Sequence, residues 1–268
     1  MHYAAAGKFF GKNDQKVSFD GITVTDTKYD YEFIDWHYHE NPHFAFTIRG
    51  DFKEGTRRET FDCGTGTLLF HNYQEPHFNV KPAGITHGFQ IEIGSKWSRQ
   101  FETEFSDLQL KTVVTDPHVK LIFFNLYRES RHCGQISNLA IDSLLLESFE
   151  VLRRVETNHS NKTPSWVKRI DEILRDTINA TPTLLELSRE LGVHWAHLSR
   201  AFPIYFRCNF GQYLRKIRVE RAMSLLLDQR LPIAEVALEC GFADQSHLIR
   251  SFREFSPITP KLFRDTFR

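Results

Sequence analysis

One pattern near the end of the chain occurs twice, and it restricts the fold more than any other feature. Residues 184–193 (LLELSRELGV) are similar to residues 233–242 (IAEVALECGF), and residues 197–202 and 247–252 then share His-Leu-x-Arg-x-Phe. Each copy predicts a short amphipathic helix, a tight turn that needs a positive φ at its glycine, and a second helix. The repeat therefore predicts an all-α region with two helix-turn-helix units.

The second helix of a helix-turn-helix unit is the one that enters the major groove of DNA. Apolar residues four apart at 198 and 202, and at 248 and 252, are predicted to face the core. The outer positions include side-chain types that hydrogen-bond bases or phosphates. These positions are Trp195, Ala196, Ser199 and Arg200 in the first unit, and Gln245, Ser246, Ile249 and Arg250 in the second.

A long helix is predicted between the two units, over residues 211–227. At the standard rise its length is about 25 Å. A rigid spacer of this length would hold two recognition helices near one turn of DNA apart, which is about 34 Å.

The charge distribution favours DNA binding over the alternative that the repeat forms two plain helical hairpins. The formal net charge of the whole chain is zero. Residues 161–268, however, contain 17 Lys and Arg against 12 Asp and Glu, whereas the first 160 residues contain 17 against 22. A basic region joined to an acidic one is typical of a DNA-binding domain attached to a separate domain.

The rest of the chain changes in character near residue 115. Residues 17–95 contain short β-branched and aromatic runs separated by turn residues, and they predict a β-sandwich or small barrel. Apolar residues then recur at helical spacing up to about residue 155, and a polar segment follows. We therefore expect an α+β protein with a β domain at 1–115, a helical connector and linker at 116–160, and the helix-turn-helix domain at 161–268.

The C-terminal residues resemble a known family. The segments GVHWAHLSRAF at 192–202, YLRKIRVERA at 213–222 and GFADQSHLIRSF at 241–252, with Thr259-Pro260 and Phe263-Arg264, are similar to the DNA-binding domain of AraC-type bacterial transcription regulators. The resemblance implies a sequence-specific regulator whose two helix-turn-helix units both contact DNA. By position, the groove-facing residues are Ala196, Ser199, Arg200, Gln245, Ser246, His247 and Arg250.

Two positions depart from the AraC pattern. Pro203 stands where the family usually has Lys or Arg, and Arg207 stands where a glycine normally ends the first recognition helix. Proline inside a helix removes a backbone donor and clashes with the carbonyl four residues earlier, here that of Ser199. We therefore expect the first recognition helix to kink or stop near Phe202, and a phosphate contact to be lost at Pro203.

Histidines in the first half form a pattern that resembles, more weakly, the two cupin motifs. His37-Tyr-His39 precedes a predicted strand, and a second run leads to Pro76-His77. The resemblance places His37, His39 and His77 at the positions of metal-binding histidines, and His43 where such cupins have a glutamate. AraC-type regulators commonly carry a cupin-like β-barrel that senses a small molecule, and the resemblance implies the same here.

Two interpretations of these histidines remain open. Neutral imidazoles at His37, His39, His43 and His77 are suited to a divalent transition metal, which would indicate a cupin-type metal-dependent enzyme or a metal sensor. Alternatively, the rings belong to the pocket or the core and hydrogen-bond the backbone. We favour the second and expect no cofactor, because a metal is the exception in AraC-type proteins. His71 and His87 are expected to be ordinary strand or surface residues.

The sequence thus predicts a regulator and not an enzyme. It contains no nucleophile–base motif, phosphate loop or paired-acid motif. Because no apolar run suits a signal peptide or a membrane span, we expect a cytoplasmic protein. The AraC resemblance implies double-stranded DNA, a small-molecule effector and RNA polymerase as partners, and a connector that forms a homodimer or packs on the barrel. An architectural DNA binder with a vestigial barrel is the remaining alternative.

Overall fold

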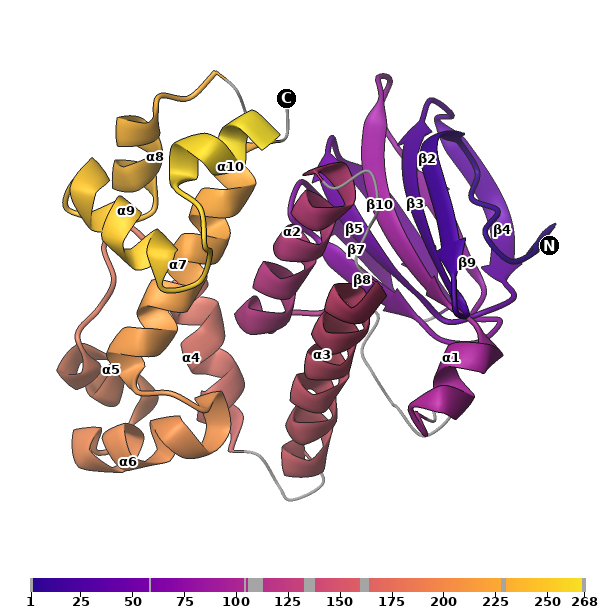
Figure 1. Cartoon of the computed structure of the whole chain (residues 1–268). Coiled ribbons are helices and arrows are strands. Elements are labelled where there is room, and N and C mark those ends of the chain that lie inside the picture. The colour runs from indigo at the N-terminus through magenta and orange to yellow at the C-terminus, as the bar shows by residue number, and fades with distance from the viewer. Residues whose placement is uncertain are drawn as a thin grey trace. The chain divides into compact units, whose positions relative to one another are not determined.

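A computed structural model describes residues 2–266, apart from residues 58, 104, 106–112, 133–137, 160–163 and 228–229. The chain divides into two units, Met1–Asp116 and Pro117–Arg268. Strands make up the first unit, with one short helix, and helices make up the second (Figure 1). The α+β organisation predicted from the sequence is confirmed.

The first unit contains strands that pair into two sheets. Their bounds are β1 His2–Ala4, β2 Lys12–Phe19, β3 Ile22–Tyr29, β4 Phe33–His39, β5 His43–Arg49, β6 Phe52–Thr56, β7 Thr60–Cys63, β8 Leu68–His71, β9 His77–Val80 and β10 Thr86–Ile93, followed by α1 Ser95–Gln100. One sheet has the order β1-β4-β9-β6-β7 and the other β2-β3-β10-β5-β8. The expected β domain is present, with its strands in two sheets that do not close into a single barrel.

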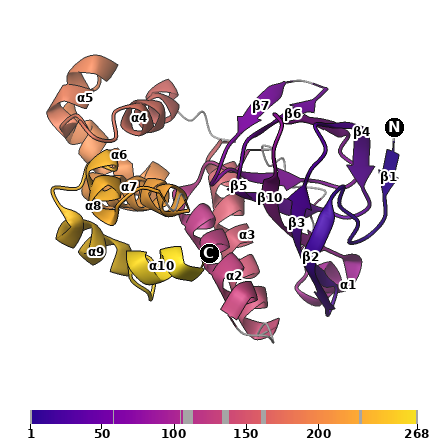
Figure 2. The ribbon, with the colours of Figure 1, turned by 90° about the horizontal axis from the view of Figure 1, so that it is seen from above.

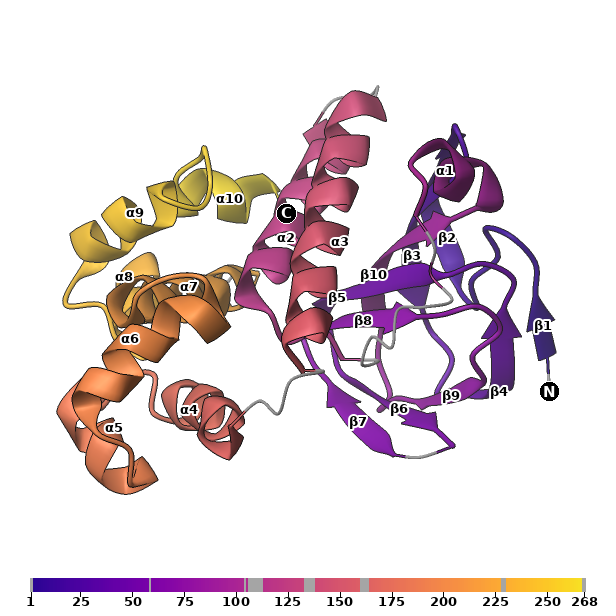
Figure 3. The ribbon, with the colours of Figure 1, turned by 90° about the horizontal axis from the view of Figure 1, so that it is seen from below.

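The two sheets enclose an interior between them (Figure 3). Strand β10 lies at the centre of its sheet, antiparallel to β3 on one side and β5 on the other. Phe89 and Ile91 of β10 and Phe44 and Phe46 of β5 are all fully buried. In β10 these apolar residues alternate with the polar Gln90 and Glu92, so one face of this antiparallel strand is apolar and packs in the core.

The second unit contains the helices. Their bounds are α2 Pro117–His132, α3 Asn138–His159, α4 Ser165–Asp176, α5 Leu184–Leu191, α6 Trp195–Phe206, α7 Phe210–Leu226, α8 Ile233–Glu239, α9 Gln245–Arg253 and α10 Pro260–Thr266. Helix α7 lies among the others, with α4 to α6 towards one of its ends and α8 to α10 towards the other (Figures 1 and 2). No helix in the described part of the chain is long and apolar enough to cross a membrane.

Helices α5 and α6 form the first helix-turn-helix unit. Thr183 and Glu186 form a capping box at the start of α5, in which each side chain accepts a hydrogen bond from the other residue's backbone. Gly192 ends α5 with a φ of 64°, the left-handed conformation that the sequence predicted for the turn. Leu198 and Phe202 of α6 are fully buried, as their spacing predicted.

Helices α8 and α9 repeat this arrangement. Gly241 adopts a φ of 74° between them, and a Cβ atom there would lie 2.3 Å from the backbone oxygen of Ile178, so no other residue fits. Asp244 caps α9 by accepting a hydrogen bond from the backbone nitrogen of His247 at 2.7 Å. Leu248 and Phe252 are fully buried. The predicted duplication is therefore present in three dimensions.

The first recognition helix differs from the sequence prediction at Pro203. Helix α6 does not stop near Phe202 but continues through Pro203 to Phe206. Aromatic packing compensates for the proline: the rings of Phe202 and Phe206 stack with centroids 4.5 Å apart, and Phe206 lies 4.5 Å from Tyr213 of α7. Arg207 ends the helix with a φ of 59°, the left-handed conformation that glycine usually supplies.

A buried ion-pair cluster joins three helices of the second unit. Glu220 of α7 accepts hydrogen bonds from Lys120 of α2 and from Arg175 of α4, each at 2.9 Å. Arg175 also donates to Asp171, which accepts a further bond from the Tyr213 hydroxyl at 2.6 Å. Although burial opposes ionisation, Lys120 and Arg175 hold the pKa of Glu220 below its usual value. Helix α2 is thereby fixed to the helix-turn-helix core.

Candidate functional site

The candidate DNA-contacting residues lie on α6 and α9. Trp195, Ser199 and Arg200 are exposed on α6, and Ala196 beside them is half-buried. Gln245, Ser246 and Arg250 are exposed on α9, and His247 is half-buried. The exposed members of each set lie outside the face formed by the buried Leu and Phe, so each helix presents polar side chains at its surface.

Two of these residues make contacts within their own helix-turn-helix unit. Arg200 Nε donates to the Ala196 backbone oxygen at 3.2 Å. The His247 ring packs edge-on against Phe242 with centroids 5.2 Å apart, and its Nδ1 lies 3.4 Å from the Ala243 backbone nitrogen. His247 therefore also stabilises the turn that precedes α9.

A second candidate site lies in the interior of the first unit, where five buried histidines meet. We call His37, His39, His43, His71 and His77 the imidazole cluster. Both sheets contribute to it, because β4 and β9 belong to one sheet and β5 and β8 to the other. Strand register brings the rings together: His37 is paired with His77, and His43 with His71. The His77 ring lies 4.2 Å from the rings of both His37 and His71, measured between centroids.

Backbone carbonyls orient several of these rings. Nδ1 of His37 lies 2.9 Å from the Asp35 carbonyl oxygen, and Nδ1 of His77 lies 2.9 Å from the Glu75 carbonyl oxygen. A ring that donates its Nδ1 proton to a carbonyl keeps a lone pair on Nε2. The sequence raised both backbone hydrogen bonding and metal binding as explanations, and this geometry is compatible with either one.

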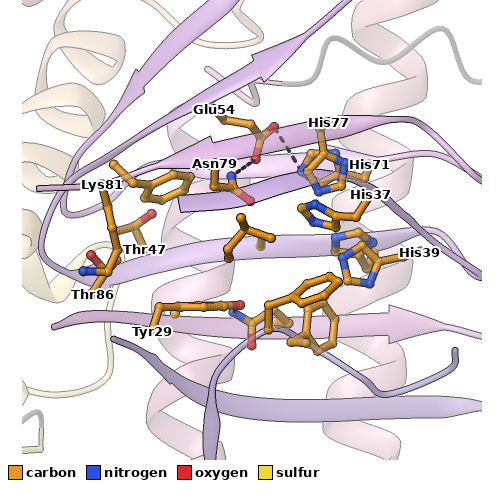
Figure 4. Close-up of a pocket in the computed structure, with 18 of the residues that line it drawn as sticks. Tyr29, His37, His39, Thr47, Glu54, His71, His77, Asn79, Lys81 and Thr86 are labelled. Carbon is orange, nitrogen blue, oxygen red and sulfur yellow. Dashed lines mark hydrogen bonds and ion pairs between the residues drawn. The ribbon is translucent and has the colours of Figure 1, made fainter. Parts of the chain in front are cut away.

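Glu54 of β6 extends the cluster, and the sequence analysis missed it. Its Oε1 atom lies 3.3 Å from His71 Nε2, and its Oε2 atom accepts a hydrogen bond from Asn79 at 3.2 Å (Figure 4). Glu54 belongs to no motif. The one signal in the sequence is the alternation of side chains between the two faces of a strand. It places Glu54 on the same face as Phe52, and therefore directs a charged residue inward.

His71 was expected to be an ordinary strand or surface residue, and that expectation is wrong. It is 1% exposed and belongs to the cluster. The pairing of β8 with β5 places it opposite His43, and this long-range register is not visible in the sequence. His87 lies outside the cluster, where it contacts Asp26.

Burial and mutual repulsion keep most of the rings neutral. Burial lowers the pKa of His37, and it holds the pKa values of His39 and His43 well below 6.5. Burial and the neighbouring His71 lower the pKa of His77 to about 3. His71 is the exception: although burial opposes its charged form, the Glu54 carboxylate raises its pKa.

The cluster occupies one end of a pocket. Lys81, Thr47 and Thr86 lie at the other end (Figure 4). Two phenylalanines that precede β2 contact the imidazoles: Phe9 stacks on His39 with centroids 4.8 Å apart, and Phe10 meets His37 edge-on at 4.6 Å. The pocket is therefore polar at both ends with an aromatic border beside the imidazoles, which suits a small ligand with more than one polar group.

Comparison with known proteins gives matches in both units. A helix-turn-helix domain family model matches residues 187–266. The Msm operon regulatory protein of Streptococcus mutans is 23% identical over 241 residues, which cover 82% of this chain and 82% of that protein. An uncharacterized HTH-type transcriptional regulator of Staphylococcus aureus is 22% identical over 229 residues, 82% of this chain. This chain covers 31% of the length of that relative.

Some solved structures resemble the C-terminal part of the chain alone, and others resemble most of the chain. The C-terminal domain of AraT, a response regulator from Geobacillus stearothermophilus, is 28% identical to this chain. The alignment covers 40% of this chain and 88% of the AraT chain, with a TM-score of 0.37. ToxT from Vibrio cholerae is 14% identical to this chain. The alignment covers 92% of this chain and 98% of the ToxT chain, with a TM-score of 0.38.

Proposed function

We propose that the chain is a sequence-specific DNA-binding transcription regulator of the AraC type, and that a small ligand in the β unit controls its activity. One observation carries the proposal. Two helix-turn-helix units present polar faces on α6 and α9, and one continuous helix, α7, connects them. Plain helical hairpins have no need of two matched polar faces.

The β unit supports the ligand part of this proposal. Its interior pocket is lined by aromatic, imidazole and hydroxyl groups from both sheets, which is the composition of a small-molecule site. A ligand there regulates DNA binding if it favours one of two arrangements of the chain. We propose RNA polymerase and a second copy of the chain as further partners, and the cytoplasm as the location, because the DNA target lies there.

The competing function is a metal-dependent enzyme built on the imidazole cluster. A transcription regulator needs no chemistry at this site, and the helix-turn-helix domain has no role in such an enzyme. We therefore propose that the chain is not an enzyme.

Selection of bound genomic DNA tests the proposal. The 268-residue chain is incubated with fragmented DNA of the source genome at moderate salt, and the retained fragments are sequenced. We expect a small set of fragments with a shared two-part motif whose halves lie about 10 base pairs apart. A matched Gln245→Ala/Arg250→Ala variant should lose the enrichment. Retention of all fragments without a shared motif would instead support the architectural alternative.

A further inference from the structure

We propose that Glu54, His71 and His77 bind one divalent transition metal ion between the two sheets. Two of these residues, Glu54 and His71, are not supplied by the cupin resemblance, which selects His37, His39, His43 and His77. It deepens the proposed function and rests on it in one respect, namely that the ion is part of the signal to which the β unit responds.

The three side chains have the spacing of metal ligands. One ligand atom from each of Glu54, His71 and His77 lies within 4.8 Å of the other two, and all three residues are buried. Ligand atoms about 2.0–2.2 Å from one tetrahedral ion lie roughly 3.3–3.6 Å apart. The 3.3 Å separation of Glu54 Oε1 and His71 Nε2 matches this value.

Two buried polar atoms at the site make no hydrogen bond. Glu54 Oε1 and His71 Nδ1 are buried and make no hydrogen bond in the described part of the chain, and the contact of Glu54 Oε1 with His71 Nε2 is an ion pair at 3.3 Å. A buried polar atom left without a partner costs about 1–3 kcal/mol, and more if it is charged. An ion bound to both Glu54 Oε1 and His71 Nε2 would give each atom a closer partner than this 3.3 Å contact, while Asn79 continues to hold the other carboxylate oxygen.

The chemistry of the three ligands selects the class of ion. Two imidazoles and one carboxylate suit zinc, iron, nickel or cobalt, whereas Mg²⁺ and Ca²⁺ prefer sites built from oxygen atoms. The Glu75 carbonyl that orients His77 resembles the outer partners of metal-bound histidines. Three protein ligands also leave a position at which water or a small ligand can bind the ion.

Metal titration of the full chain tests the site. Protein stripped with a chelator is titrated with Zn²⁺ by calorimetry and with Co²⁺ by visible absorption, with Mg²⁺ and Ca²⁺ as negative controls. We expect one Zn²⁺ or Co²⁺ per chain. Glu54→Gln and His71→Ala should each weaken binding more than about 100-fold, because the loss of an outer partner alone costs 10–100-fold.

Two control histidines make the assignment specific. His118→Ala, on α2 in the other unit, should leave affinity unchanged, and His37→Ala should change it less than about tenfold. If wild-type protein binds neither ion at micromolar concentration, the proposal is wrong. It is equally wrong if His37→Ala abolishes binding while Glu54→Gln does not. Glu54→Gln is nearly isosteric, so it provides a test even where a histidine variant fails to fold.

Measurements of DNA binding distinguish a failure of the metal-site proposal from a failure of the proposed regulatory function. The motif found by genomic selection is titrated with metal-free and Zn²⁺-loaded protein. A difference in affinity of at least fivefold, absent in Glu54→Gln, supports a sensing role. Stoichiometric Zn²⁺ with unchanged affinity for DNA would overturn the sensing role alone. Zn²⁺ binding without any specific DNA binding would overturn the proposed function.

Discussion

Exposed side chains on the second recognition helix differ in what they can recognise. Gln245 and Ser246 begin α9 and Arg250 lies one turn later. Glutamine forms two hydrogen bonds with adenine and arginine forms two with guanine, whereas serine bonds to either base or to phosphate. Gln245 and Arg250 are therefore the residues on α9 best suited to sequence discrimination.

Gln245→Ala and Arg250→Ala should each weaken binding at the cognate site by about 1–3 kcal/mol and change non-specific binding little. Fluorescence anisotropy with cognate and random duplexes measures both affinities. Lys168→Ala removes an exposed cation from α4 and serves as the control. Equal losses on the two duplexes would mean that α9 contacts phosphates and does not read bases.

For single residues, the sequence predicts the position of a side chain where that position depends on neighbours close in the chain. Leu198 with Phe202 share a helix face, and their burial follows from their spacing alone. His37 and His39 are likewise two apart on one strand. Glu54 and His71 could not be predicted, because their place depends on which strands pair and in which register, and no local rule determines this.

Among the elements, α6 and the residue that ends it carry both departures from the AraC pattern. Pro203 is exposed on a helix that continues beyond it. A lysine there would add a cation to the surface that carries Ser199 and Arg200. We expect Pro203→Lys to strengthen binding to cognate and random DNA alike and to steepen the salt dependence by about one counterion. Titrations at several salt concentrations measure this slope. Unchanged or lower affinity would show that the proline itself helps α6 to fit its site.

Arg207 holds a left-handed conformation that costs a residue with a Cβ roughly 1–2 kcal/mol. Arg207→Gly should therefore stabilise the second unit by about 0.5–1 kcal/mol, after subtraction of the greater flexibility of glycine in the unfolded chain. Thermal or urea denaturation measures the change. Arg207→Ala removes the same charge but keeps the Cβ, so it should give no such gain. Equal stabilisation by both variants would point to charge and not to conformation.

Element boundaries follow from the sequence where caps and periodicity agree. The spacer helix predicted at 211–227 is α7, Phe210–Leu226. Of the kink or stop expected near Phe202, the stop is wrong, because tertiary contacts of Phe202 and Phe206 with α7 outweigh the local cost of Pro203. Local signals position a helix, but packing decides whether an unfavourable residue ends it.

For the molecule as a whole, the ion-pair cluster around Glu220 determines which fragments are stable. We expect residues 161–268 to bind DNA at low salt but to be less stable than residues 117–268. The shorter fragment lacks Lys120, which pairs with buried Glu220, and Phe124, whose ring lies 5.6 Å from that of Phe263. The loss of a charged hydrogen bond alone costs about 1.5–3 kcal/mol.

Urea denaturation of the two fragments measures this difference. Lys120→Met in the longer fragment should reproduce part of the loss, and Lys168→Met, which removes a lysine exposed on α4, should not. Equal stability of the two fragments would show that α2 contributes nothing to the folding of the helix-turn-helix core.

The attachment of α2 to Glu220 also has a consequence for protein engineering. A regulator that responds to a new signal is commonly made by fusing a foreign sensor to an existing DNA-binding domain. The polar segment at 156–164 is the obvious junction from the sequence, yet a fusion there would discard Lys120 and leave Glu220 with Arg175 as its remaining cationic partner. A junction at 116, ahead of α2, would keep this contact and should yield the more stable hybrid.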